Sequence, residues 1–227
     1  GAYVYYFENY VSKNSLSDFI SPIIDFLSSI GINFFGSDPV SAGFGLFNAG
    51  GIIFMIIGIG LSKMLADKYG KRNVFGVFLF ISTLFILVFY VLSPDSINLI
   101  FGAQIFHGFF YGITIPLLWA MIADVADYSE WKNNRRATAI IFSAMMVGLK
   151  LGLSIGGALV ASILGSYGYV PNSVGEQTES AILGTKMLVS IFPSIPFLVA
   201  AALLFFYVID KKMEEKIEQD LLKKRKS

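Results

Sequence analysis

The stretch Gly51-Ile52-Ile53-Phe54-Met55-Ile56-Ile57 decides the fold class, because it stands without charge inside a longer apolar run over 41–62. A run of roughly 20 apolar residues crosses the about 30 Å hydrocarbon core of a bilayer as a helix. The run lacks the period-two alternation of a strand in a membrane barrel. A helix is then the remaining way to satisfy the backbone hydrogen bonds in lipid.

Four further apolar runs have a similar length, which predicts five membrane-spanning helices. The predicted spans are 41–62, 73–93, 97–127, 137–166 and 183–208. The composition agrees, because 55% of the 227 residues are hydrophobic and only 15% are charged, against roughly 25% charged in an ordinary soluble domain. The sequence therefore predicts an all-α membrane protein.

The positions of lysine and arginine predict the orientation, because basic residues in short loops stay on the cytoplasmic side of a membrane. Fourteen of the 17 basic residues fall on one side of five alternating spans. They are Lys63, Lys68, Lys71, Arg72, Lys132, Arg135, Arg136, Lys211, Lys212, Lys216, Lys223, Lys224, Arg225 and Lys226. Lys13 and Lys186 lie on the opposite side. We therefore expect a multi-pass protein of the cell membrane with a cytoplasmic carboxyl terminus.

Three segments outside these spans have their own character. Residues 1–12 are membrane-like but too short to cross, so we interpret them as the outer end of a truncated span. Within the predicted outer loop 13–40, apolar residues recur at helical spacing from Leu16 to Ile30. This pattern predicts an amphipathic helix that either lies at the outer interface or packs on other spans. Residues 209–227 are predicted to form a cytoplasmic tail with a short solvated helix.

Several classes of function are excluded by what the sequence lacks. The chain has no cysteine and one histidine, His107, which excludes thiolate nucleophiles, disulfides and cysteine-ligated metal centres. A formal charge of +1 gives no basic excess for a nucleic-acid partner. An embedded enzyme would need a nucleophile and a base at one depth. We therefore expect no enzyme, no cofactor and no metal site within this chain. His107 is interpreted either as a proton relay or as a hydrogen-bonded packing residue.

Lys150 is the most informative single residue. It stands about thirteen positions into the span 137–166, hence about 20 Å deep at roughly 1.5 Å per residue. An ammonium group at this depth costs at least roughly 2.5–3.5 kcal/mol, and a lysine side chain that reaches about 6 Å is too short to carry its charge to the interface. Lys150 should therefore face a bundle interior and pair with an anion. The predicted spans offer no carboxylate at that depth, so the partner is expected from other sequence.

The same helix carries a repeat of small residues. Ala144, Gly148, Gly152 and Gly156 recur every four residues, which lets another helix approach closely. Three polar or amphipathic side chains elsewhere are candidates for a substrate cavity, although helix packing or an interfacial position explains each of them equally well. They are Tyr6, Gln104 and Trp119.

Charged residues also gather at the predicted cytoplasmic end of the third span. Asp124 and Asp127 are three positions apart and share a helix face, and Arg136 follows in the next loop. Opposite charges at helix ends form a latch that breaks when a bundle opens, or they simply set the topology and solvate the surface. The residues alone leave these two alternatives equal.

The stretch Trp119-Ala120-Met121-Ile122-Ala123-Asp124-Val125-Ala126-Asp127-Tyr128-Ser129-Glu130-Trp131-Lys132 resembles the glycoside-pentoside-hexuronide:cation symporters. The resemblance continues through Lys150-Leu151-Gly152, Gly168-Tyr169-Val170-Pro171-Asn172 and Leu183-Gly184, so it covers nearly all of the chain. Two positions depart from the family pattern. Asn133-Asn134 replaces a frequent Thr-Gly, and Met146 replaces a polar residue near the sugar.

The resemblance implies a major facilitator fold of twelve helices in two six-helix halves, with sugar and coupling cation bound between the halves near the midplane. This chain resembles the second half, with its first helix truncated and the amino-terminal half as its partner. The lysine that matches Lys150 belongs to a charge network with carboxylates of the first half. The positions that match Asp124, Asp127 and Arg136 belong to a cytoplasmic network that stabilises the outward-open state.

The resulting hypothesis is a secondary active transporter. It would move a glycoside, pentoside or hexuronide together with Na⁺ or H⁺ by alternating access. The alternative is a non-transporting membrane sensor or scaffold that retains the fold, because a fold alone does not determine function.

Overall fold

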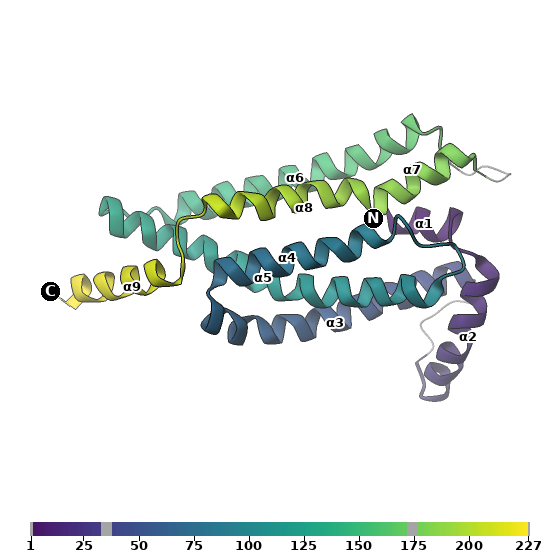
Figure 1. The fold of residues 1–227 in the computed structure, drawn as a ribbon, viewed down its shortest axis with the longest axis horizontal. Coiled ribbons are helices and arrows are strands. Elements are labelled where there is room, and N and C mark those ends of the chain that lie inside the picture. The colour runs from purple at the N-terminus through teal and green to yellow at the C-terminus, as the bar shows by residue number, and fades with distance from the viewer. Residues whose placement is uncertain (1, 33–37, 172–176, 227) are drawn as a thin grey trace.

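A computed structural model describes residues 2–32, 38–171 and 177–226, and every regular element in these ranges is a helix (Figure 1). Helices α3, α4, α5, α6 and α8 run along one long axis, with α9 at one end of the molecule and α1 and α2 at the other. Their bounds are α1 Tyr3–Asn9, α2 Lys13–Ser29, α3 Pro39–Tyr69, α4 Lys71–Val88, α5 Ile97–Asn133, α6 Thr138–Ser166, α7 Glu179–Val189, α8 Ile191–Leu203, the 3₁₀-helix η1 Leu204–Phe206 and α9 Lys211–Lys226.

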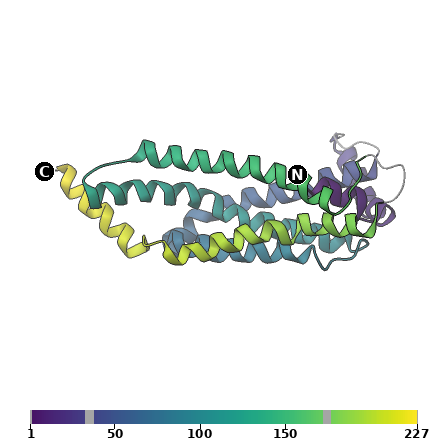
Figure 2. The ribbon, with the colours of Figure 1, turned by 90° about the horizontal axis from the view of Figure 1, so that it is seen from above.

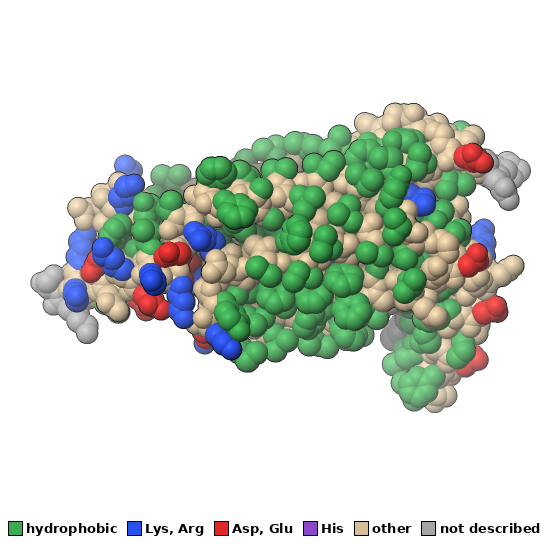
Figure 3. Space-filling view, in the orientation of Figure 1, with side chains coloured by type: hydrophobic (Ala, Val, Ile, Leu, Met, Phe, Trp, Pro, Cys, Tyr) green, Lys and Arg blue, Asp and Glu red, His purple; other side chains and the backbone are tan. Residues whose placement is uncertain are grey.

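Five helical segments are long and apolar enough to cross a membrane. They are α3, α4, α5, α6 and the segment Glu179–Phe206, which joins α7, α8 and η1. Apolar side chains cover the middle of the face seen in Figure 3, and the charged side chains gather toward its two ends. The all-α membrane fold class predicted from the apolar runs is confirmed.

The close packing of α3 and α5 forms the centre of the bundle. Gly108 and Gly112 of α5 lie against the backbone carbonyls of Gly51 and Met55, and Gly58 of α3 makes a similar contact with α5. A Cβ atom at any of these three glycines would collide with the backbone of the opposite helix. Glycine therefore sets how near the two helix axes come.

Aromatic residues fill the end of the bundle where the chain begins. Tyr6 and Phe7 of α1 are fully buried, and they pack against Phe47 of α3, Phe89 after α4 and Phe101 of α5. Most of these rings meet edge to face, the arrangement that their quadrupoles favour. The short helix α1 thereby closes this end of the bundle.

The predicted amphipathic helix is present as α2, and its two halves have different surroundings. Leu16 and Ile20 are buried in the aromatic cluster, where Leu16 lies so close to Gly43 that a Cβ there would overlap it. Phe26 and Ile30 near the other end are 64% and 56% exposed, where the helix projects from the bundle (Figure 1). The first half of α2 therefore packs on the spans, Ile24 adds a partly buried contact, and the last turns are exposed.

The last span is interrupted at Ser190, between α7 and α8. Pro193 has no N–H to donate to the carbonyl of Val189, so the regular α-helical pattern breaks there. Two serine hydroxyls bond to carbonyl oxygens near this break. Ser190 Oγ donates to the carbonyl oxygen of Lys186 at 2.6 Å, and Ser194 Oγ donates to the carbonyl oxygen of Ser190 at 2.6 Å. The span is thus interrupted at Ser190, and serine hydroxyls bond to carbonyl oxygens before and at the interruption.

Helix α6 stands apart from the other spans. Among its described residues Leu164 alone is buried. Figure 2 shows α6 along one edge of the molecule and α8 along the opposite edge. A Cβ atom added at Gly148, Gly152 or Gly156 would meet nothing within 4 Å. The small-residue face of α6 is therefore open.

Candidate functional site

Three charged side chains meet at the end of the bundle that carries α9, and we call them the Lys71 network. Lys71 Nζ lies 2.7 Å from both carboxylate oxygens of Asp124 and 2.9 Å from Glu214 Oε1. Gly70, with a φ of +83°, turns the chain between α3 and α4 and places Lys71 at the start of α4. The three side chains are 16–32% exposed, so the network is partly shielded from solvent.

Helix α9 contributes Glu214 because its apolar face is docked on the end of α5. Ile217 and Leu221 are buried, and they belong to a cluster with Tyr128 and Trp131 of α5. Trp131 Nε1 also donates to Asp220 Oδ2 at 3.0 Å. The tail was expected as a solvated helix; the helix is present, but one face of it is packed.

A cavity of about 360 Å³ lies between α9 and the ends of α4 and α5. Lys71, Asp124, Asp127 and Glu214 line it together with apolar residues of α9. Next to it, Tyr207 is partly buried beside Asp124 and Glu214, and its hydroxyl donates to the carbonyl of Met121 at 3.1 Å. Burial and the two neighbouring carboxylates raise the pKa of Tyr207.

Arg136 forms a second network on the same side of the molecule. Its guanidinium lies 3.3 Å from Asp127 Oδ1 and 3.7 Å from Glu130 Oε2. Asn134 ends α5 in the left-handed conformation, with a φ of +54°. Asparagine tolerates this conformation, which explains how it replaces the glycine of the family pattern. The structure thus divides the three predicted residues, because Asp124 belongs to the Lys71 network whereas Asp127 joins Arg136.

Lys150 lies on the exposed surface of α6, the thirteenth of its 29 residues. In the part of the chain that the structure describes, no carboxylate lies within 4.0 Å of its ammonium group. Lys150 lies on the side of α6 opposite Gly148 and Gly152. Because residues 146–159 are all exposed, this charge is not enclosed by the described helices.

The three predicted cavity residues occupy different surroundings. Tyr6 is fully buried in the aromatic cluster, and Gln104 lies against Gly51 of α3. Neither Tyr6 Oη nor Gln104 Oε1 has a hydrogen-bond partner among the described residues. Trp119 is 41% exposed on α5. None of the three lines the cavity beside α9.

His107 is held by hydrogen bonding and stacking. Its Nδ1 lies 2.9 Å from Ser82 Oγ and 3.2 Å from the carbonyl oxygen of Ser82, and its ring stacks on Tyr111. These contacts fit the packing interpretation. Within the described ranges, no three His, Cys, Asp or Glu side chains are grouped as a metal ion would require.

Lys71 and Glu214 were missing from the residues predicted for the cytoplasmic network. In the sequence, Lys71 is one of several basic residues in a loop. Such a loop indicates which side of the membrane it lies on, but it does not indicate which residue Lys71 pairs with. For α9 a local signal existed, because Ile217 and Leu221 are four positions apart in an otherwise charged segment.

The sequence that forms these apolar spans and charge networks is similar to the sequences of known proteins. The family described as MFS/sugar transport protein matches residues 26–211 of this chain. The chain belongs to this family of glycoside-pentoside-hexuronide:cation symporters. It is accordingly part of a multi-pass membrane protein of the major facilitator superfamily.

Several curated members of the family are similar to this chain. The symporter YjmB of Bacillus subtilis is 32% identical over 74% of this chain and 36% of its own length. The glucuronide carrier protein homolog of Escherichia coli is 30% identical over 75% and 38%. The isoprimeverose transporter of Lactiplantibacillus pentosus is 29% identical over 87% and 41%. The chain spans between 32% and 57% of the length of the curated relatives that it matches.

Proposed function

We propose that this chain is the carboxyl-terminal part of a secondary active transporter that couples the entry of a sugar to Na⁺ or H⁺. The proposal is supported by family membership and by relatives named as a glucuronide carrier homolog and an isoprimeverose transporter. The proposed substrate class is a glycoside, pentoside or hexuronide. In this proposal the protein is not an enzyme and needs no cofactor beyond the coupling cation.

The observation that carries the proposal is the uncompensated charge of Lys150. An ammonium group near the middle of a membrane costs at least roughly 2.5–3.5 kcal/mol unless an anion faces it. Its carboxylate partner is proposed to lie in an amino-terminal six-helix half, which docks on the exposed side of α6 that carries Lys150. A coupling cation that binds the same carboxylates would compete with Lys150 and release it. The coupling cation therefore alters the charge around the sugar.

The two networks near α9 are proposed to act at the cytoplasmic side, where most basic residues lie. While the Lys71 network and the Asp127–Arg136 pair are intact, the ends of α4, α5 and α9 stay together. Opening toward the cytoplasm would separate such pairs, and the outward-open state would thereby be favoured. Tyr6, Gln104 and Trp119 remain candidates for the sugar cavity.

The proposal is tested by uptake into cells that carry the full-length protein. Labelled glycosides, pentosides and hexuronides are supplied with and without a Na⁺ gradient, and with and without a proton gradient. We expect one sugar to accumulate and its accumulation to collapse with one of the two gradients. Protein that reaches the membrane but accumulates no sugar would contradict the proposal and favour the sensor or scaffold.

Substitution of Lys150 tests the coupling role separately. Lys150→Ala should abolish gradient-driven accumulation, because the carboxylates lose the charge that the cation displaces. The matched control is Lys63→Ala, which removes an exposed lysine near the end of α3. Normal accumulation by the Lys150→Ala protein would show that the charge of Lys150 has no part in coupling.

A further inference from the structure

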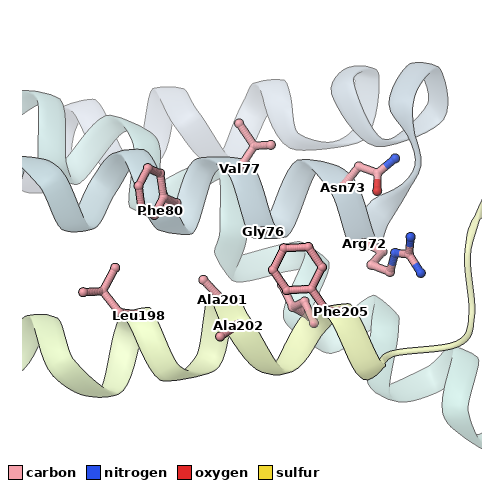
Figure 4. A pocket seen from close by; sticks show the side chains of 10 residues that line it. Arg72, Asn73, Gly76, Val77, Phe80, Leu198, Ala201, Ala202 and Phe205 are labelled. Carbon is pink, nitrogen blue, oxygen red and sulfur yellow. The ribbon is translucent and has the colours of Figure 1, made fainter.

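A groove of about 560 Å³ runs between α4 and α8 on the surface of the bundle (Figure 4). Its lining is almost wholly apolar. Arg72 and Asn73 stand at one end of it, and Phe80 and Leu198 stand at the other. The groove is therefore polar at one end and apolar along the rest of its length.

Small residues make the groove deep. Gly76 of α4 and Ala201 and Ala202 of α8 line it where larger side chains would fill it. A Cβ atom at Gly76 would lie only 3.2 Å from Leu204 Cδ1. Val77 and Phe80 beside the groove are 54% and 47% exposed. Because both helices are membrane spans, these exposed apolar walls face acyl chains rather than water.

Arg72 places at the mouth of the groove a cation that has no counter-ion among the described residues. Its Nη1 donates to the carbonyl oxygen of Tyr207 at 2.9 Å, which fixes the guanidinium beside the end of η1. Over the described ranges, no carboxylate lies within 4.0 Å of it. A guanidinium has five N–H donors, so four remain for another acceptor. The neighbouring Lys71, in contrast, is neutralised by Asp124 and Glu214.

The dimensions of the groove match one leaflet. Arg72 and Phe80 are eight residues apart on α4, or about 12 Å at roughly 1.5 Å per residue, and one leaflet contributes about 15 Å of hydrocarbon. Two exposed phenylalanines of η1 mark the polar end of the groove. Phe205 lines the groove and is 88% exposed, and Phe206 next to it in the chain is 81% exposed. Tyrosine and tryptophan are enriched at the level of the lipid headgroups, and Tyr207 follows Phe206 at this end of the groove.

We propose that this groove binds an anionic phospholipid. The phosphate accepts hydrogen bonds from the Arg72 guanidinium, and one acyl chain lies along Val77, Phe80 and Leu198. Arginine suits this role because its planar fork matches phosphate oxygens in pairs. In the proposed orientation the mouth faces the cytoplasmic leaflet, which carries the anionic lipids.

The position of the groove favours a lipid over the amino-terminal half of the transporter. The open small-residue face and the unpaired Lys150 belong to α6, which lies along the edge of the molecule opposite α8 (Figure 2). A partner half that docks on α6 therefore leaves the groove between α4 and α8 in contact with the bilayer.

The first test measures lipid affinity by native mass spectrometry of the purified full-length protein, titrated with phosphatidylglycerol or phosphatidylcholine. We expect tighter binding of phosphatidylglycerol. Arg72→Gln should weaken it about tenfold, the effect of losing a hydrogen bond to a charged group. It should weaken phosphatidylcholine less, because the choline cation already offsets the charge of that lipid's phosphate. Gly76→Leu, which fills the groove, should weaken both lipids. The control Gly60→Leu adds the same side chain where no atom lies within 4 Å and should change neither.

Equal affinity for the two lipids in the unmodified protein would overturn the proposal, as would unchanged phosphatidylglycerol binding by Arg72→Gln. That variant remains decisive if Gly76→Leu fails to fold. A second measurement places a photo-crosslinking amino acid at Val77 in membranes. A phospholipid adduct supports the proposal; a crosslink to another segment of the same protein, or to a second copy, overturns it.

Discussion

Helices α5 and α6 follow one another in the chain and are both long, apolar and marked by glycines four positions apart, yet only α5 is packed. In α5 a third of the membrane-spanning window is buried, against 6% in α6. Gly108 and Gly112 touch the backbone of α3, whereas Gly148 and Gly152 face open space. Glycine spacing therefore indicates that a helix can be approached closely. It does not indicate which helix approaches it.

The largest effect is expected where α5 is packed. Gly112→Leu should lower the free energy of unfolding by about 3 kcal/mol, because the added side chain collides with the backbone carbonyl of Met55 and a backbone cannot rotate away. Thermal unfolding of the full-length protein in detergent measures this loss. The control is Gly102→Leu on the same helix, where a Cβ meets nothing within 4 Å. Equal losses in the two variants would show that the contact with α3 is not what makes Gly112 sensitive.

A smaller effect on α6 would sharpen the comparison. If the amino-terminal half docks on the small-residue face, Gly152→Leu should destabilise the full-length protein by about 2 kcal/mol through overpacking. It should also slow transport. Gly157→Leu is the comparison, because at roughly 3.6 residues per turn it lies on the Lys150 side of the helix, and a Cβ atom there also meets nothing within 4 Å. A change within about 0.5 kcal/mol for Gly152→Leu would mean that this face contacts lipid.

The smallest effect concerns Lys71, whose charge joins Asp124 near the end of α5 to Glu214 of α9. Lys71→Met leaves Asp124 and Glu214 without their shared cation. Because the side chains are partly exposed, we expect a loss of about 1 kcal/mol rather than the larger cost of breaking a fully buried pair. A double-mutant cycle with Asp124→Asn isolates the pairwise part, measured by thermal unfolding. If the effects of the two substitutions are additive, Lys71 and Asp124 have no measurable coupling energy despite their short distance.

Much of the fold follows from the sequence because apolar runs are a local property. Five runs of span length correspond to the five long apolar helices, and the periodic residues around Leu16 mark α2. The break at Ser190 follows from Pro193. Local patterns do not say which half of α2 packs, because that depends on Gly43 of a different helix leaving room for Leu16.

The candidate site was predicted less completely, for a related reason. Asp124, Asp127 and Arg136 stand close in the sequence, and a charge pattern groups them. Pairing, however, depends on which helix ends are neighbours, and this brings Lys71 and Glu214 to Asp124 from segments 53 and 90 positions away. For Lys150, sequence depth indicates a need for a partner, and the described helices do not supply one.

The position of Glu214 in the chain also has a consequence for biosynthesis. A membrane protein is inserted span by span from its amino-terminal end, and Glu214 follows all five spans. The pair of Lys71 and Asp124 can form once α4 and α5 are in the membrane, but Glu214 can join only after the last span has left the ribosome. The Lys71 network can therefore be complete only after all five spans of this chain have been synthesised.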